Sequence, residues 1–199
     1  ENTYKNPPGL GLVGHWPFDS STISDKIYDR SGRANHGYFV GTATSSAKTT
    51  GKLGQAFRFN KSTDYITLPA LGVSGASGRT ISAWIYPTSG SGAQAIYSSG
   101  AASSYALFEV TFNQTNPNNI YIVASNSDVY TDANTVSLNA WHHVVVTYPA
   151  NSILNATNAR VYIDGVSQNL SNAGAQGQNL NTTDANYSIG SRAGANSFF

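Results

Sequence analysis

The sequence predicts an all-β protein, a sandwich of two antiparallel sheets, and three observations support this class. Residues 105–112 alternate in character, with Ala106, Phe108, Val110 and Phe112 on one side. Short β-branched and aromatic runs recur between polar turns, and no segment keeps a helical period. Only 11% of the residues are charged, and Gly, Asn, Ser and Thr are abundant. Many short strands joined by polar turns, each giving alternate side chains to one interior, explain all three.

The clearest strands lie in the second half of the chain. Residues 141–148 form a β-branched and aromatic run that ends at Pro149, and residues 159–163 form a second run that ends at the turn dipeptide Asp164-Gly165. These two runs are expected to be neighbouring strands. Further short strands are expected at residues 12–18, 36–40, 56–59, 80–87 and 120–124, with Pro17 placing the first one at an edge or a bulge.

Length and composition limit the number of domains and the kinds of chemistry and partner to expect. The 199 residues predict one domain over residues 12–199, and the polar residues 1–11, with Pro7-Pro8-Gly9, read as a leader or an interdomain linker. The chain has no Cys, so disulfides and thiolate chemistry are excluded. A net charge of +1 gives no reason to expect nucleic acid as a partner, and no apolar run reaches the roughly 20 residues of a membrane span.

Several motifs in a fixed order resemble landmarks of laminin-G-like jelly-roll modules, members of the concanavalin A-like lectin/glucanase superfamily. They are Gly14-His-Trp-Pro-Phe-Asp19, Asp29-Arg-Ser-Gly-Arg-Ala-Asn-His-Gly37, Gly51-Lys-Leu-Gly-Gln-Ala-Phe-Arg-Phe59, Asp64-Tyr-Ile66, Thr80-Ile-Ser-Ala-Trp-Ile-Tyr-Pro87, Trp141-His-His-Val144 and Tyr162-Ile-Asp-Gly165. The resemblance spans residues 11–190 and implies a jelly-roll β-sandwich.

The resemblance also implies a closing strand that this chain does not show. Such modules continue after a segment like Tyr187-Ser-Ile-Gly190 into a strand with paired acids, which lies beside the first strand, whereas this chain reaches Phe199 without it. An unpaired edge beside residues 12–18 would invite strand exchange with another chain. The alternative is that the sequence is a fragment.

The same alternation defines outward-facing side chains, which are candidates for ligand binding. Aromatic rings stack on sugars while charged groups hydrogen-bond hydroxyls. We therefore expect a shallow carbohydrate groove formed by Tyr105, Glu109, Tyr121, Arg160 and Tyr162. Any solvated sheet has a similar composition, so an unliganded polar face is the alternative. Tyr97 and Tyr130 are alternative loop aromatics, and Trp84 and Trp141, which lie inside apolar runs, are assigned to the core.

Catalysis has little support in the sequence. Glycosidases place two carboxylates around the scissile bond, but this chain has only two Glu, Glu1 and Glu109. A hydrolase built on Glu109 and a distant Asp is the low-weight alternative. A Ser-His-Asp triad needs no local signature, and no Gly-x-Ser-x-Gly elbow is present. His142 and His143 are adjacent in a strand, so they point to opposite faces and cannot chelate one metal ion together.

Calcium is the cofactor that the resemblance implies. The oxygen donors at family motif positions are Asp19, Asp29, Asn35, Asn60 and Asp64. Asp128, Asp132 and Asn134 form a separate candidate loop. None of them has the fixed spacing of a calcium loop, and turn or capping roles are the alternative.

These observations predict a non-catalytic recognition module. Its expected partners are polysaccharides or glycoprotein glycans, and its expected setting is a larger secreted or surface protein, extracellular and bacterial. The alternative from another class is a structural or adhesive domain that binds a protein, including strand exchange through the open edge.

Overall fold

The computed structural model describes residues 11–19, 26–41, 47–101, 103, 105–114, 116–124 and 126–192. The expected leader at residues 1–11 lies outside this part except for Gly11, and its role stays a prediction. The strands are β1 (Lys26–Ile27), β2 (Gly37–Val40), β3 (Lys48–Thr50), β4 (Gln55–Phe57), β5 (Tyr65–Leu68), β6 (Arg79–Ile85), β7 (Gln94–Gly100), β8 (Leu107–Phe112), β9 (Ile120–Val123), β10 (Ser127–Thr131), β11 (His142–Tyr148), β12 (Arg160–Ile163), β13 (Val166–Ser167), β14 (Leu170–Gly174) and β15 (Tyr187–Ile189).

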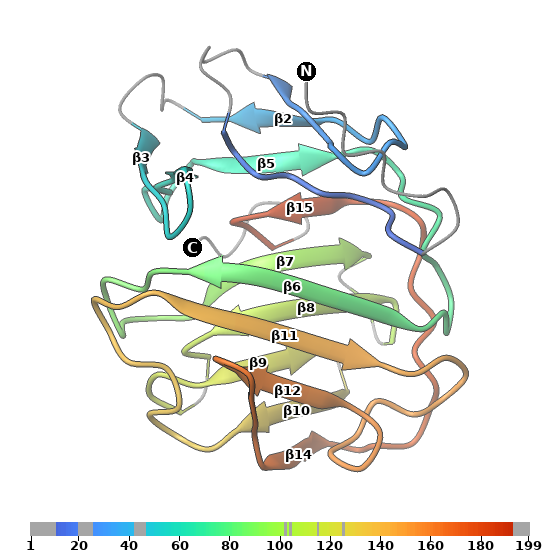
Figure 1. Cartoon of the computed structure of the whole chain (residues 1–199). Coiled ribbons are helices and arrows are strands. Elements are labelled where there is room, and N and C mark those ends of the chain that lie inside the picture. Colours follow the sequence, from blue (N-terminus) through green and yellow to red (C-terminus); the bar gives the residue numbers. More distant parts are fainter. Residues whose placement is uncertain are drawn as a thin grey trace.

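The strands form two facing layers of unequal width (Figure 1). A nine-stranded sheet runs in the order β1-β2-β5-β15-β7-β8-β9-β10-β14, and a four-stranded sheet runs β13-β12-β11-β6. The β3–β4 hairpin is a separate piece. All the pairings are antiparallel, and no described residue belongs to an α-helix, so no described helix could cross a membrane. The predicted jelly-roll sandwich of two antiparallel sheets is confirmed.

The core lies between the two layers, as the alternation predicted. Phe108, Val110 and Phe112 of β8 and Ile120 and Ile122 of β9 are buried in it. From the smaller sheet, Val144, Val146, Val161 and Ile163 face the same core. Side-chain alternation on the facing strands therefore positions the two outward faces of the sandwich.

The central pair of strands also agrees with the sequence. β11 pairs with β12 from Val144 opposite Ile163 to Thr147 opposite Arg160. Asp164 and Gly165, with φ of 52° and 82°, make the turn into β13. Both turn residues are left-handed, which is the requirement of a tight hairpin turn and the reason for an Asp-Gly dipeptide there.

The first predicted strand is wrong. Residues 11–19 contain no strand, and their polar groups instead bind the turn at residues 29–36. The His15 N–H donates to Asp29 Oδ1 at 2.8 Å, and the Trp16 indole N–H donates to the Asn35 carbonyl at 2.9 Å. Pro17 has no N–H, and Phe18 has a φ of 63°, so the backbone cannot continue as a ladder.

Candidate functional site

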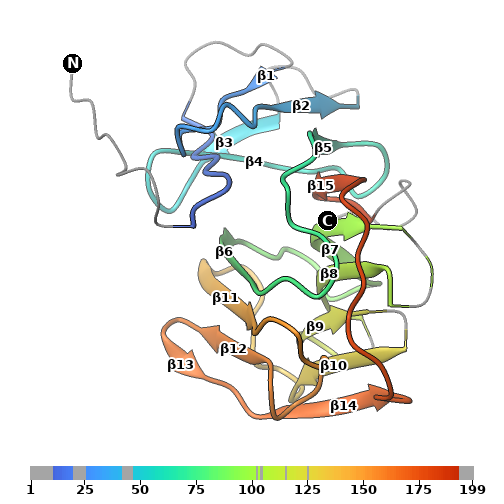
Figure 2. The same cartoon turned by 90° about the vertical axis from the view of Figure 1, so that its right-hand side faces the viewer.

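The five predicted ligand-binding residues do not form one surface. Glu109 and Tyr121 lie on β8 and β9 of the nine-stranded sheet, and Tyr105 lies in the turn before β8, whereas Arg160 and Tyr162 lie on β12 of the other sheet. Their outward faces are on opposite sides of the sandwich, as the two layers in Figure 2 show. The expected single groove is therefore wrong, because the pattern gives the face of a strand but not its sheet.

The Glu109 side of the sandwich is closed to water at this position. Glu109 is 0% exposed, and Tyr121 is 5% exposed. Tyr121 packs in a second apolar cluster with Leu107 and Val123, and its ring stacks on Tyr130 at 5.5 Å. The alternative aromatics Tyr97 and Tyr130 are not in loops, since they lie on β7 and β10. Tyr97 packs in the main core, and Tyr121 and Tyr130 pack against each other, so these rings present no open sugar platform.

An ion pair between the buried Glu109 and the partly exposed Arg192 lies on that face. Arg192 Nε donates to Glu109 Oε2 at 2.7 Å, while Glu109 Oε1 has no hydrogen-bond partner. Burial raises the pKa of Glu109, and Arg192 opposes part of that rise. Asp128 adds to the rise through its charge. A carboxyl group that water does not reach, already paired with a cation, is poorly placed to protonate a glycosidic oxygen.

The outward face of the four-stranded sheet is open. We call it the Trp84 face and define it as Thr80, Ser82, Trp84, His143, Val145, Arg160 and Tyr162. The register joins Trp84 to His143, Ser82 to Val145, and Val145 to Tyr162, so these residues share one side. Trp84 is 43% exposed, which overturns its assignment to the core. Trp141 is half-buried and packs against the exposed Tyr86 ring at 5.4 Å, outside the core cluster.

Two contacts hold the Trp84 ring in place, and a hydrogen bond fixes one of the contacting side chains. The His143 ring lies 5.1 Å from it, and His143 Nε2 is 2.8 Å from the Ser82 hydroxyl. Lys52, from the turn between β3 and β4, places its Nζ 5.4 Å from the ring centroid. An exposed indole fixed in this way loses little freedom when it stacks on a ligand.

A chain of hydrogen bonds resembling a catalytic triad lies at the end of the same sheet. His142 Nδ1 is 2.7 Å from Asp164 Oδ2, and His142 Nε2 is 2.8 Å from the Ser137 hydroxyl. Asp164 Oδ1 also accepts the His143 backbone N–H at 2.8 Å. These bonds fasten the β12–β13 turn to the start of β11. Neither histidine lies in the core cluster, and each has its own hydrogen-bond partners.

The predicted calcium ligands fall in three separate turns. Asp29 accepts bonds from His15, Ser31 and Asn35, and these bonds outweigh the effect of burial and hold its pKa below the usual value. Asn60 Oδ1 accepts three backbone N–H groups, including that of Asp64, and Asp19 accepts that of Gln55. Among the described residues, no group of three His, Asp or Glu could hold a metal ion. These oxygens accept hydrogen bonds within turns or between neighbouring segments, and calcium binding stays a prediction.

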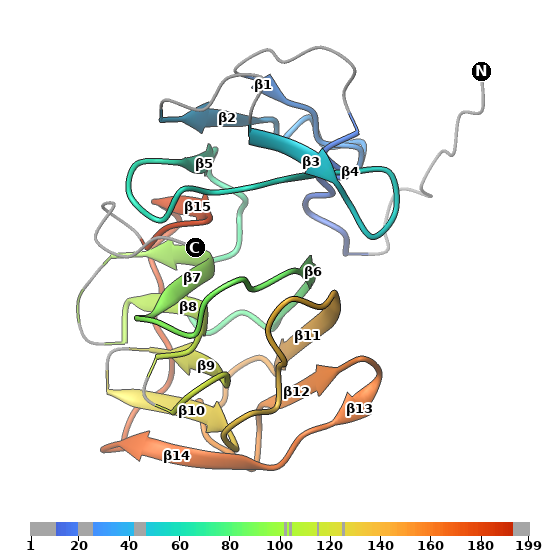
Figure 3. The ribbon, with the colours of Figure 1, turned by 90° about the vertical axis from the view of Figure 1, so that its left-hand side faces the viewer.

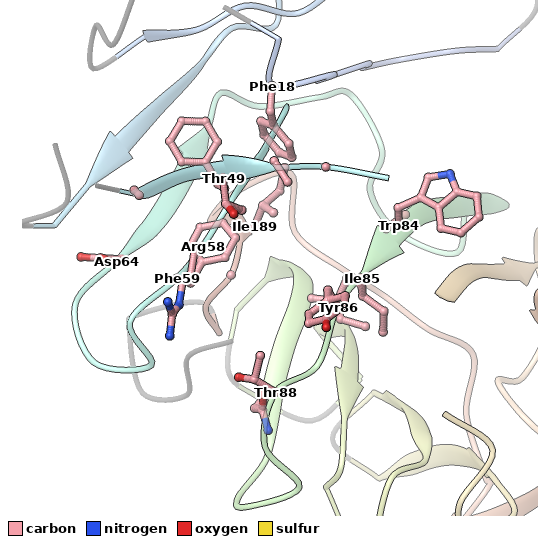
Figure 4. A pocket seen from close by; sticks show the side chains of 18 of the residues that line it. Phe18, Thr49, Arg58, Phe59, Asp64, Trp84, Ile85, Tyr86, Thr88 and Ile189 are labelled. Carbon is pink, nitrogen blue, oxygen red and sulfur yellow. The ribbon is translucent and has the colours of Figure 1, made fainter. Parts of the chain in front are cut away.

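A cleft of about 1000 Å³ opens between β6 and the β3–β4 hairpin (Figure 4). We call it the β6 cleft. Its apolar lining includes Phe18, Phe57, Phe59, Ile85, Ile96 and Ile189. Its polar lining includes Arg58, Lys61, Asp64 and Gln94. Trp84 stands at its border, and in Figure 4 the indole extends away from Phe18 and Phe59.

Trp84 was missed as a site residue although the sequence carried a signal for it. Residues 80–85 alternate polar and apolar, with Ile81, Ala83 and Ile85 toward the core. Trp84 therefore lies on the outward face with Thr80 and Ser82, but the apolar residues around it favoured an assignment to the core.

The comparisons with known proteins agree with this architecture, which defines a concanavalin A-like jelly-roll module. A laminin G-type family model, described as concanavalin A-like lectin/glucanases superfamily, matches residues 60–199. The chain belongs to this family. Curated protein sequences show no significant match.

Among solved structures, the chain is similar to domain 4 of AbnA, a GH43 extracellular arabinanase from Geobacillus stearothermophilus, in complex with arabinotriose. The TM-score is 0.64 at 19% identity, covering 94% of this chain and 86% of that one. At this identity the likeness supports the fold.

Proposed function

We propose that the chain is a non-catalytic carbohydrate-binding module, and that its sugar-binding surface is the Trp84 face. The observation that carries the proposal is an indole that is 43% exposed on β6, the edge strand of the four-stranded sheet, and held by its neighbours. Large aromatic residues on a strand are normally buried, so an open and fixed ring indicates a contact surface.

The rest of the face supplies what a sugar needs beside the ring. Ser82 and Thr80 carry hydroxyls on the same side, and Arg160 and Tyr162 lie two strands away, about 10 Å from β6 by strand spacing. Arg160 uses one nitrogen on the carbonyls of Thr157 and Ala159 and keeps other donors for a ligand. This arrangement suits a short stretch of polysaccharide lying across the three strands β6, β11 and β12.

Several further points support the proposal without deciding the sugar. The family includes lectins, and the similar domain 4 belongs to an arabinanase and was determined with arabinotriose. Arabinan is therefore a reasonable first ligand among plant and bacterial polysaccharides. The burial of Glu109 against Arg192 favours binding over hydrolysis. An extracellular or cell-surface setting, in a larger bacterial protein, is part of the same proposal.

The test is binding of the purified chain to a panel of polysaccharides, with and without Ca²⁺ and with a chelator. Trp84→Ala should weaken binding to any positive polysaccharide about five- to thirtyfold, since stacking and apolar contact of one ring account for about 1–2 kcal/mol. Tyr162→Ala should weaken it less. Tyr38→Ala is the matched control, because Tyr38 is 50% exposed on β2 of the other sheet.

Two results would contradict the proposal. One is a panel without a single hit from protein shown to be folded. The other is a hit that is unchanged in Trp84→Ala and Tyr162→Ala, which would place the sugar elsewhere. Hydrolysis of the bound polysaccharide would contradict the non-catalytic part alone. Loss of binding with the chelator would support the calcium prediction.

A further inference from the structure

The Trp84 face has two cationic side chains near opposite corners. Lys52 reaches the first corner from the turn between β3 and β4, and its Nζ lies 5.4 Å from the centroid of the Trp84 ring. Figure 3 shows this hairpin close to β6, on the side of the molecule that the four-stranded sheet occupies. Arg160 marks the second corner on β12, because its row joins it to Thr147 and Thr80.

The strand register sets the separation of these corners. Trp84 pairs with His143, and Thr80, four residues earlier on β6, lies in the same row as Arg160. Four residues along a strand cover about 14 Å and two strand spacings about 10 Å, so the backbone positions of Trp84 and Arg160 lie roughly 17 Å apart. A single sugar ring is much shorter than this distance. A ligand that reaches both cations is therefore a chain of sugars.

The positive charge of the two corners is not neutralised within the described part of the chain. Lys52 and Arg160 are both exposed, and no ion pair among the described residues includes either of them. Two carboxylates border the face. Asp164, after β12, binds a histidine ring and the His143 backbone N–H, and Asp19, against the β3–β4 hairpin, accepts a backbone N–H of β4. The face is therefore complementary to a ligand with negative charge.

The position of Lys52 over the indole separates charged from neutral ligands. A sugar ring that stacks on Trp84 meets the ammonium group, whose attraction to the aromatic ring it has to replace. A neutral sugar offers only hydroxyl groups to the displaced ammonium. A sugar with a carboxylate on its ring offers an ion pair, so stacking and charge pairing act together at this corner.

Arg160 is suited to a carboxylate at the other corner. Its Nη1 donates to the carbonyls of Thr157 and Ala159, which fixes one side of the guanidinium group. The hydrogen bonds of the described residues leave Nε and Nη2 without an acceptor. Neighbouring guanidinium donors form the planar fork that binds the two oxygens of a carboxylate.

We propose that the Trp84 face binds acidic polysaccharides, whose sugar rings carry carboxylate groups, in preference to neutral polysaccharides of the same backbone. One uronate unit stacks on Trp84 with its carboxylate on Lys52, and a later unit of the same chain places its carboxylate on Arg160. This inference rests on the proposed function, because it specifies the charge of the ligand at the same surface.

The experiment compares matched pairs of soluble oligosaccharides by titration calorimetry. The pairs are oligogalacturonate with its carboxyl-reduced form and oligoglucuronate with its carboxyl-reduced form, so each pair differs only in charge. At least one acidic member should bind about five- to tenfold more tightly than its neutral counterpart. Raising the ionic strength from about 0.1 M to about 1 M shortens the Debye length from about 10 Å to about 3 Å and should remove most of this preference.

Two double variants with the same loss of net charge assign the preference to the face. Lys52→Gln with Arg160→Gln should weaken binding of the acidic member about five- to tenfold and leave the neutral member within about twofold. Arg30→Gln with Arg33→Gln is the control, because both arginines are exposed and lie in the turn after β1, outside the face. It should leave both members within about twofold. Circular dichroism and the melting temperature establish that each variant folds.

The outcomes distinguish this inference from the proposed function. Equal affinity for the two members of each pair would overturn the inference, as would a preference that survives Lys52→Gln with Arg160→Gln. A preference that the control variant reduces equally would overturn it too, since net charge alone would then be its cause. If neutral oligosaccharides still bind and Trp84→Ala weakens them, the proposed function stands without the inference. Folded protein that binds no member of either pair and nothing on the polysaccharide panel would overturn both.

Discussion

The two outward faces of the sandwich carry similar residue types but differ in their access to water. On the four-stranded sheet, Trp84 is 43% exposed and Arg160 reaches solvent. On the nine-stranded sheet, the corresponding outward residues Glu109 and Tyr121 are 0% and 5% exposed. The difference shows that an outward position in a strand does not guarantee contact with water. Neighbouring outward side chains can cover one another, as Tyr121 and Tyr130 do.

The largest expected difference between the faces is at their aromatic residues. Tyr121→Ala should lower the free energy of unfolding by about 3–4 kcal/mol, because it removes a buried ring from the cluster with Leu107 and Val123. Tyr162→Ala should cost less than about 1 kcal/mol, since Tyr162 is only half-buried. Chemical denaturation of both variants measures this contrast. Equal losses would mean that the two faces are equally packed.

A smaller effect is expected at the two arginines. Arg192→Met should lower stability at pH 7 by about 2–3 kcal/mol, because Glu109 then stays buried without its cation. Arg160→Met, on the open face, should change it by less than about 0.5 kcal/mol.

The pH dependence of Arg192→Met sharpens this comparison. Loss of the cation raises the pKa of Glu109 further in the folded state, while the unfolded chain keeps about 4.5. The penalty should therefore be small at pH 4 and grow as the pH rises above 4.5. Denaturation series at pH 4 and pH 7 test this, and a penalty independent of pH would mean that the loss is one of packing.

The smallest effect is expected at Asp164, in the turn between β12 and β13 of the four-stranded sheet. Burial opposes ionisation of Asp164, but bonds from His143 and His142 outweigh it and lower the pKa of Asp164 below 3.8. A lowered pKa stabilises the fold above the unfolded value and loses that contribution as the pH falls through the folded value. Asp164→Asn should therefore reduce the melting temperature by a few degrees at pH 7 and much less at pH 3. A loss that is equal at both pH values would assign it to the turn conformation instead.

The success of the sequence analysis depended on the range of the interactions involved. Alternation at residues 107–112 and 160–163, and the Asp164-Gly165 turn, are local patterns, and the structure confirms them, whereas Tyr105 and Ala106 lie in a turn before β8. The error at residues 12–18 had a non-local cause, because the turn at Asp29 takes the hydrogen bonds that a neighbouring strand would have taken. Trp84 was wrongly assigned to the core because its run is largely apolar, although the alternation of residues 80–85 places its ring on the outward side.

The sequence by itself determined that the chain is a jelly-roll sandwich and which side of most strands faces the core. The sandwich class and the core-facing sides follow from side-chain alternation and turn chemistry, which act over a few residues, whereas the jelly roll was implied by the resemblance of the motifs to laminin-G-like modules. Only the tertiary structure decided which outward residues share a surface, because that depends on the sheet each strand joins. It separated Glu109 and Tyr121 from Arg160 and Tyr162, brought Lys52 to Trp84 across the chain, and left β6 at the border of a cleft.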